Sequence, residues 1–236
     1  MRPRAEHAPE LLDRPHHDRA ELEQSLDQLA EVNRLLGGHR AVLRTLAAIA
    51  PASPSWSILD IGTGSADIPI AIDRWARRRR LDVRITATDI HPQIREIASA
   101  RTREHPAIRI EVADALDLRY GDDHFDFVLL SLTLHHFERN DQIRAVREAA
   151  RVARHAIIVN ELERCTPNYI GARLLARTRW RGNRLTRHDG PLSVLRAFTA
   201  AELRDVAVAA GIQVLKLSRY FFHRLVMVGR GAAPEG

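Results

Sequence analysis

Hydrophobic positions along the chain follow two spacings in turn, and this alternation predicts strands and helices in regular succession. Short apolar runs predict buried strands, and apolar residues at helical spacing predict amphipathic helices. Helical spacing lies near 67–80, 92–104 and 141–153, between the first five of the apolar runs. The alternation predicts an α/β fold, Rossmann-like and doubly wound, with a mostly parallel seven-stranded sheet. The predicted strands are 57–60, 83–88, 108–112, 125–131, 156–160, 212–218 and 224–228.

The end of the chain departs from this alternation. A helix that begins with the capping box of Thr199 and Glu202 ends before Gly211. Only the short connection 219–223 separates the last two predicted strands, which leaves no room for a crossover helix. We therefore predict that the sheet ends in a C-terminal antiparallel hairpin.

The beginning of the chain has no strand pattern. Residues 1–17 hold prolines, histidines and mixed charge without an apolar period, which predicts a disordered or loosely attached tail. Apolar residues at helical spacing then run from Asp18 to Leu36, where a glycine pair breaks the helix. A second helix follows, so we predict an N-terminal helical segment over 18–54.

A glycine-rich turn follows the first strand and carries the most informative motif of the chain. Asp60 ends the strand, Gly62 and Gly64 permit close backbone approach, and a helix begins at Asp67. This layout is typical of a nucleotide-type cofactor site, with a plain glycine turn as the alternative. A dinucleotide site would need a third glycine at position 67, where a carboxylate instead repels a pyrophosphate. The two aspartates suit a cationic ligand without phosphate, such as S-adenosylmethionine.

The sequence Asp-x-Gly-x-Gly at 60–64 resembles the first motif of the class I S-adenosylmethionine-dependent methyltransferases. The resemblance covers about 57–230 and implies a methyltransferase domain over 55–236, with an acceptor-site insertion at 161–198. It also implies that 18–54 is a lid, that S-adenosylmethionine is the cofactor and that S-adenosylhomocysteine is its product. The cofactor-binding residues that it assigns to the turn are Asp60, Gly62, Thr63, Gly64, Ser65 and Asp67.

Further cofactor residues are expected after other strands, because ligands of open parallel sheets lie at the carboxyl ends of the strands. Asp89 follows the second strand and can accept both ribose hydroxyls, and Ile90 would pack on the adenine. In similar proteins Asp114 or its neighbour Ala115 meets the adenine amine, and Ser131 would line the methionine end. For Asp89 and Asp114, a helix cap or a turn residue is the alternative.

The stretch Leu134-His135-His136 after the fourth strand resembles small-molecule methyltransferases of quinone biosynthesis and natural-product tailoring. The Asn/Asp-Pro-Pro-Tyr/Phe motif that acts on exocyclic amines is missing here, which disfavours a nucleobase acceptor. We predict that His136 or His135 is the base or the acceptor-orienting group, with a helix cap or a backbone contact as the alternative. His188, in a polar turn with Asp189, is a third candidate, and an Asp-Gly turn with an exposed histidine is its alternative.

Two more predictions concern the lid and metals. Asn33 and Arg34 lie near the end of the first helix, and we expect them to reach the cofactor's carboxylate or ribose if this helix folds over the cofactor. A solvent-exposed helix end is the alternative. We predict no metal, because cation-dependent phenol methyltransferases group carboxylates after the fourth strand, where this chain is apolar and bears histidines.

Composition narrows the choice of partners. The 236 residues are 45% hydrophobic and 28% charged, which is ordinary for one sizeable domain. The net charge is +6, but the basic residues are scattered and Lys216 is the only lysine among 36, so we expect no nucleic-acid partner. No apolar run approaches the roughly 18 residues of a membrane span. The single cysteine, Cys165, and the lack of an apolar signal core predict a cytoplasmic protein.

These observations predict methyl transfer from S-adenosylmethionine to a small hydrophobic acceptor. The most direct reading is O-methylation of a phenolic or enolic hydroxyl in secondary metabolism. A nucleic-acid methyltransferase and a non-catalytic cofactor-binding protein are the rivals. The acceptor, its attacking atom and the regiochemistry stay open, and a homodimer is compatible with the sequence.

Overall fold

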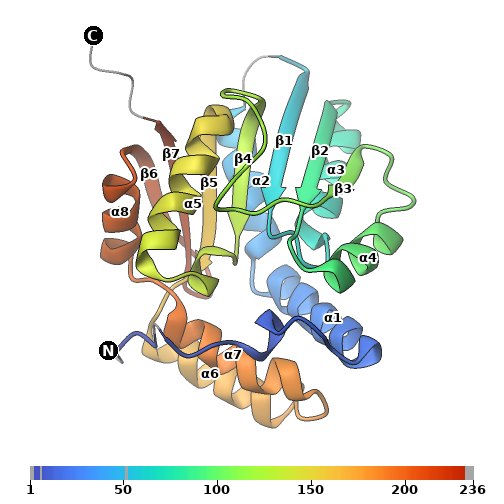
Figure 1. Cartoon of the computed structure of the whole chain (residues 1–236), viewed down its shortest axis with the longest axis vertical. Coiled ribbons are helices and arrows are strands. Elements are labelled where there is room, and N and C mark those ends of the chain that lie inside the picture. Colours follow the sequence, from blue (N-terminus) through green and yellow to red (C-terminus); the bar gives the residue numbers. More distant parts are fainter. Residues whose placement is uncertain (1–2, 6, 51–52, 232–236) are drawn as a thin grey trace.

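The computed structural model describes residues 3–5, 7–50 and 53–231, and these form a seven-stranded sheet covered by helices (Figure 1). The strand order is β3-β2-β1-β4-β5-β7-β6. The predicted α/β fold class is therefore confirmed. The strands are β1 (Ser55–Ile61), β2 (Asp82–Thr88), β3 (Ile108–Glu111), β4 (Phe125–Ser131), β5 (Ala153–Leu162), β6 (Ile212–Tyr220) and β7 (Arg224–Gly231).

Strand direction follows the prediction from the connections. Strands β3, β2, β1, β4 and β5 pair in parallel, whereas β7 is antiparallel to both β5 and β6. The predicted bounds of β5 were too short, because helix α5 (Arg139–Val152) runs straight into the strand without a turn.

The two faces of the sheet bury different helices, because side chains of a strand point alternately to opposite faces. Leu59 and Ile61 of β1 pack with α5 and α8 (Ala200–Ala209), whereas Trp56 and Ile58 pack with helices on the other face. That face is covered by α2 (Gly38–Ile49) and α3 (Asp67–Arg79). Both cores are continuous, so the carboxyl ends of the parallel strands are held rigidly.

A separate helical layer lies beyond these strand ends (Figure 1). It consists of α1 (Arg19–Leu35), α6 (Thr166–Arg177) and α7 (Arg184–Arg196), and α1 also packs on α4 (Pro92–Arg101). None of the helices in the described part of the chain has the length and apolar character needed to cross a bilayer.

Helix α7 contains the segment that the sequence predicted to be a polar turn. Asp189 and Gly190 are buried inside this helix, so the turn prediction is wrong. A Cβ atom at Gly190 would lie 2.3 Å from Cζ3 of Trp180, so glycine is required for the indole to pack on the helix. The Asp189 carboxylate binds the N-terminal segment. It accepts hydrogen bonds from the backbone N–H groups of Leu11 (2.8 Å) and Leu12 (2.9 Å).

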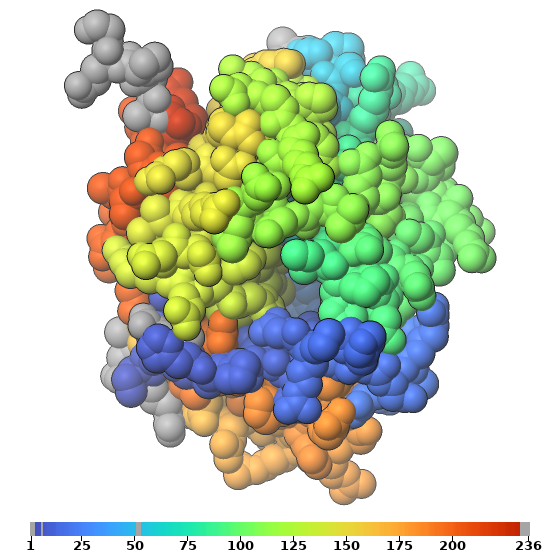
Figure 2. All heavy atoms as spheres, in the orientation of Figure 1, coloured from blue at the N-terminus to red at the C-terminus, as the bar shows by residue number. Residues whose placement is uncertain are grey.

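The N-terminal segment 7–18 lies against α7 instead of forming the loose tail that the sequence predicted. It includes the short 3₁₀ helix η1 (Leu11–Asp13), and Glu10 is only 3% exposed. Figure 2 shows this segment crossing the surface between the sheet layer and the outer helices. The polar composition misled the prediction, because the segment is held by backbone hydrogen bonds to Asp189.

Candidate functional site

Two adjoining cavities lie between the sheet and the outer helical layer. The first, of about 440 Å³, lies at the carboxyl ends of β1, β2 and β4; the second, of about 830 Å³, lies between α1, α6, α7 and the β6–β7 connection. Both are lined by Leu12, Leu29, Asn33, Leu132 and His136. The first cavity brings together these predicted cofactor residues: Asp60, Gly62, Thr63, Gly64, Ser65, Asp67, Asp89, Ile90, Asp114, Ala115 and Ser131.

The glycine turn shapes the floor of the first cavity. Gly62 has a φ of +69°, and a Cβ atom there would lie 2.7 Å from the Thr133 side chain. Thr133 cannot retreat easily, because its hydroxyl donates a hydrogen bond to the Ile61 carbonyl at 3.0 Å. Gly64 has a φ of +54° but meets nothing within 4 Å, so its Cα faces open space. Gly62 is thus needed for packing, and Gly64 leaves room for a ligand.

Asp89 fastens this turn to the end of β2. Its carboxylate accepts hydrogen bonds from Gly64 N at 3.1 Å and from His91 N at 2.9 Å. Burial raises the pKa of Asp89, although these hydrogen bonds work in the opposite direction. Next to it, the Ile90 side chain is 64% exposed and forms an apolar wall of the cavity.

The carboxylates at the turn are in different environments. Asp60 is 2% exposed, and burial together with the negative charges of Asp67 and Asp89 raises its pKa to about 7. Burial also opposes ionisation of Asp67, but hydrogen bonds from His39 (2.7 Å) and Asn33 (2.8 Å) outweigh it and lower the pKa. The first cavity therefore has a negative wall that a positively charged ligand would relieve.

Arg34, which was predicted to reach the cofactor, does not point into the site. Arg34 is exposed and lines neither cavity, whereas Asn33 is buried and bonds to Asp67. Successive residues of an α-helix are rotated by about 100°, so Arg34 cannot share the inward direction of Asn33. The predicted contact between Arg34 and the cofactor is not supported by this position.

His135 and His136 lie in the short 3₁₀ helix η2 (Leu134–His136), which follows β4, and they differ in surroundings. His135 is buried, lines the second cavity, and donates from Nδ1 to Glu161 Oε2 at 2.8 Å. His136 lines both cavities, and its Nδ1 lies 2.8 Å from Asp13 Oδ1. Burial alone would lower the pKa of His136, but Glu10, Asp13 and Glu161 raise it to about 9. It is therefore an imidazolium at neutral pH.

The third predicted histidine lies elsewhere. The His188 side chain is 49% exposed and lines neither cavity; its Nδ1 lies 2.7 Å from Asp189 Oδ1. The expected pairing with Asp189 exists, but α7 directs it away from the strand ends. His188 therefore does not belong to the candidate site.

Several residues of the site had no place in the sequence prediction. Glu161 is the next-to-last residue of β5. It is fully buried and accepts a hydrogen bond from Leu134 N at 2.8 Å. Arg196 donates hydrogen bonds to the carbonyl groups of Ala8, His135 and His136, and so joins the N-terminal segment to η2. Applying the rule of strand ends to the fifth strand would have found Glu161. The sequence carries no comparable signal for Arg196.

The fold, with its strand order and its glycine turn beside buried carboxylates, defines a class I methyltransferase architecture with a site for a cationic, nucleotide-type cofactor. Residues 59–157 match the family model described as a methyltransferase domain. Over these residues the chain carries a class I S-adenosylmethionine-dependent methyltransferase domain.

Curated relatives are similar over part of their length. The chain is 30% identical over 98 residues to the ubiquinone/menaquinone biosynthesis C-methyltransferase of Rickettsia akari, covering 40% of this chain and 39% of that protein. It is 32% identical over 124 residues to the demethylmenaquinone methyltransferase of Deinococcus radiodurans, covering 51% of this chain and 49% of that protein. The chain thus matches less than half the length of these relatives.

Solved structures share the fold. An S-adenosylmethionine-dependent methyltransferase from Aquifex aeolicus superposes with a TM-score of 0.65 at 13% identity, covering 91% of this chain and 98% of that chain. An O-methyltransferase family 2 protein from Planctomyces limnophilus, in complex with apigenin, gives a TM-score of 0.64 at 15% identity and covers 93% of this chain and 63% of that chain. Both likenesses show the fold alone.

Proposed function

We propose that the protein transfers a methyl group from S-adenosylmethionine to a small hydrophobic acceptor, at a phenolic or enolic hydroxyl. The observation that carries this proposal is the pair of adjoining cavities, with His136 lining both and His135 lining the second. When bound, S-adenosylmethionine supplies an electrophilic methyl group on a positively charged sulfur. Catalysis then depends mainly on holding the acceptor oxygen close to that methyl group.

The first cavity suits this cofactor in charge and polarity. Its carboxylates would attract the positive charges of the cofactor. Burial disfavours the ionised form of Asp60 most strongly, so a nearby positive charge would stabilise this carboxylate. We expect the free lone pairs of Asp89 to accept the ribose hydroxyls. The exposed face of Ile90 would pack on the adenine, and Asp114 would meet its amine.

Cofactor binding is expected to depend on pH through Asp60. Its pKa of about 7 means that the carboxylate, which a cationic ligand prefers, forms as the pH rises through neutrality. The affinity for S-adenosylhomocysteine, which retains the ammonium group, should therefore be about tenfold higher at pH 8 than at pH 6. Isothermal titration calorimetry at both pH values measures this difference. Asp60→Asn should remove most of it, and an unchanged pH dependence in that variant would contradict the assignment.

The second cavity suits an apolar acceptor that carries oxygen. Arg224 is 1% exposed, and its Nε and Nη1 atoms have no hydrogen-bond partner within the described part of the chain. Burial lowers the pKa of Arg224 to about 10, so it stays charged and can bind an oxygen atom of the acceptor. The apolar side chains that line this cavity include Leu29, Val32, Leu162, Leu174, Leu175, Val194 and Phe222.

His136 and His135 can play different roles at the acceptor: one orients an oxygen atom and the other acts on the hydroxyl. His136 is protonated at neutral pH, so it can donate a hydrogen bond and orient an oxygen but cannot accept the hydroxyl proton. His135 is held through Nδ1 by Glu161, which directs Nε2 away from that carboxylate. We expect His135 Nε2 to act on the acceptor's hydroxyl.

C-methylation is the second candidate, and the curated relatives favour it. One of them is named a C-methyltransferase, whereas the Planctomyces limnophilus protein is named an O-methyltransferase. Both reactions begin with the loss of a proton from an acidic hydroxyl. The resulting phenolate or enolate is nucleophilic at oxygen and at the neighbouring carbon. The same cavity therefore fits either outcome.

A transfer assay with a labelled methyl group on the cofactor tests the proposal. We expect label in hydrophobic phenols and enols and none in RNA or DNA, and NMR of the product separates an O-methyl from a C-methyl group. Tight binding of S-adenosylhomocysteine without transfer to any acceptor of the panel would instead support a non-catalytic binding protein. Methylated nucleic acid would support the nucleic-acid rival.

A further inference from the structure

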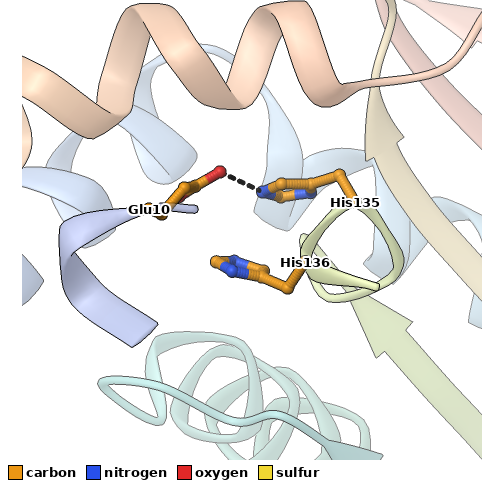
Figure 3. Close-up of side chains that lie close together, drawn as sticks. All are labelled: Glu10, His135 and His136. Carbon is orange, nitrogen blue, oxygen red and sulfur yellow. Dashed lines mark ion pairs between the residues drawn. The ribbon is translucent and has the colours of Figure 1, made fainter. Parts of the chain in front are cut away.

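We propose that Glu10, His135 and His136 form a binding site for one divalent transition-metal cation at the acceptor cavity. One oxygen of Glu10 and one nitrogen of each histidine all lie within 4.8 Å of one another (Figure 3). Figure 3 shows the three side chains converging from two segments, the N-terminal segment and η2. All three residues line the second cavity.

The imidazole rings are held in the orientation that metal-binding histidines adopt. His135 Nδ1 is 2.8 Å from Glu161 Oε2, and His136 Nδ1 is 2.8 Å from Asp13 Oδ1. An ionised carboxylate only accepts hydrogen bonds, so each Nδ1 carries a hydrogen and each Nε2 faces another partner. A metal ion would replace the hydrogen that the His136 imidazolium carries on Nε2. Metal-bound histidines characteristically donate their second N–H to a carboxylate in this way.

The Glu10 carboxylate lacks a full set of partners. Oε2 accepts a hydrogen bond from Ser193, but the buried Oε1 has no hydrogen-bond partner within the described ranges. His135 Nε2 lies 3.7 Å from Oε1, which is too long for a hydrogen bond. A buried carboxylate oxygen without a partner is costly, and a cation between these two atoms would satisfy both.

The fixed charges around the two rings favour a cation. Three carboxylates, those of Glu10, Asp13 and Glu161, act on His136 from the packed elements. Two guanidinium groups oppose them: Arg196 lies 3.8 Å from Glu10, and Arg224 interacts with Glu161. Their formal charges sum to minus one.

The donor set indicates the kind of metal. Two imidazole nitrogens and one carboxylate suit Zn²⁺, Fe²⁺ or Co²⁺, whereas Mg²⁺ prefers oxygen ligands. Three protein ligands leave coordination positions open toward the cavity. The sequence predicted no metal, because no carboxylates are grouped after the fourth strand. Glu10 was not considered, since it lay in a segment that was expected to be a loose tail.

The role of such a cation rests on the proposed function. With a cation bound, His135 Nε2 would be a ligand and could not act as the base. The cation would then neutralise negative charge on the acceptor's hydroxyl oxygen, while the hydroxyl proton passes to solvent. This would favour acceptors with a second oxygen beside the reacting hydroxyl, because two oxygens can share the open positions.

Cobalt titration of the protein tests the site directly. After treatment with EDTA and its removal, the protein is titrated with Co²⁺ at pH 8. Imidazole binds metals in its neutral form, so Co²⁺ must displace the second proton of His136. We expect visible absorption bands that saturate at one equivalent, without cofactor or acceptor present. Glu10→Gln should weaken binding on the order of 100-fold, since even outer partners of ligands are worth tenfold to 100-fold. His136→Ala should abolish the bands.

Matched controls separate a site from a general loss of structure. Glu138→Gln changes an exposed carboxylate two residues beyond His136, and this variant should bind Co²⁺ like the unaltered protein. Circular dichroism of each variant checks that it is folded. Absence of bands in the folded, unaltered protein, or binding that Glu10→Gln leaves unchanged, would overturn the metal site. Methyl transfer that persists in EDTA would then leave the proposed function standing without the metal site. Metal binding without transfer to any acceptor would support the metal site and contradict the proposed function.

Discussion

Replacement of Asp89 by alanine is expected to weaken the binding of S-adenosylhomocysteine about 100-fold, because charge-assisted hydrogen bonds contribute about 1.5–3 kcal/mol each. Asp89 accepts hydrogen bonds from Gly64 N and His91 N, and we expect its remaining lone pairs to accept the ribose hydroxyls. The variant loses both the ligand contact and the fastening of the glycine turn. Isothermal titration calorimetry measures the change in affinity.

Two further variants separate these contributions. Asp89→Asn keeps one carbonyl oxygen but loses the charge, so its affinity should fall between that of the unaltered protein and that of Asp89→Ala. Asp82→Ala removes an exposed carboxylate from the opposite end of the same strand and should leave affinity unchanged. If folded Asp89→Ala binds within about threefold of the unaltered protein, the ribose assignment is wrong.

Replacement of Glu161 by glutamine is expected to lower kcat of methyl transfer by about 10²–10⁴-fold, the range found for lost proton-transfer groups. Leu134 N donates to Glu161 Oε1, so it would hold the carbonyl oxygen of the new amide in the same place. The amide NH₂ would then face His135 Nδ1 and donate to it. His135 would have to carry its hydrogen on Nε2, which disables that atom both as a proton acceptor and as a metal ligand.

The shape of the side chain is preserved in this variant, so the affinity for S-adenosylhomocysteine should change little. Glu163→Gln is the matched control, because Glu163 is also a buried carboxylate near the end of β5 but pairs with Arg219, outside both cavities. Its kcat should stay within about threefold of the unaltered value. A similar kcat in Glu161→Gln and in Glu163→Gln would exclude a role for the His135–Glu161 pair.

The elements of the fold and the cofactor motif could be predicted from the sequence because both rest on local patterns. Short apolar runs located every strand of the sheet, and the length of the β6–β7 connection fixed the antiparallel hairpin. The carboxyl ends of parallel strands meet at one edge by geometry alone, so Asp60, Asp89 and Asp114 were expected to lie together, and all three line the first cavity.

The acceptor side of the site was decided by tertiary contacts that local patterns do not encode. Asp189 holds the N-terminal segment in place from 177 or more residues away in sequence, and this brings Glu10 to His135. The pKa of His136, near 9, likewise depends on carboxylates from two separate segments, the N-terminal segment and β5. Sequence by itself therefore determined the sheet and the cofactor turn, because hydrophobic period and glycine placement act over short distances. Only the folded chain decided which charged groups are buried side by side, because burial and electrostatic interaction depend on distance in space.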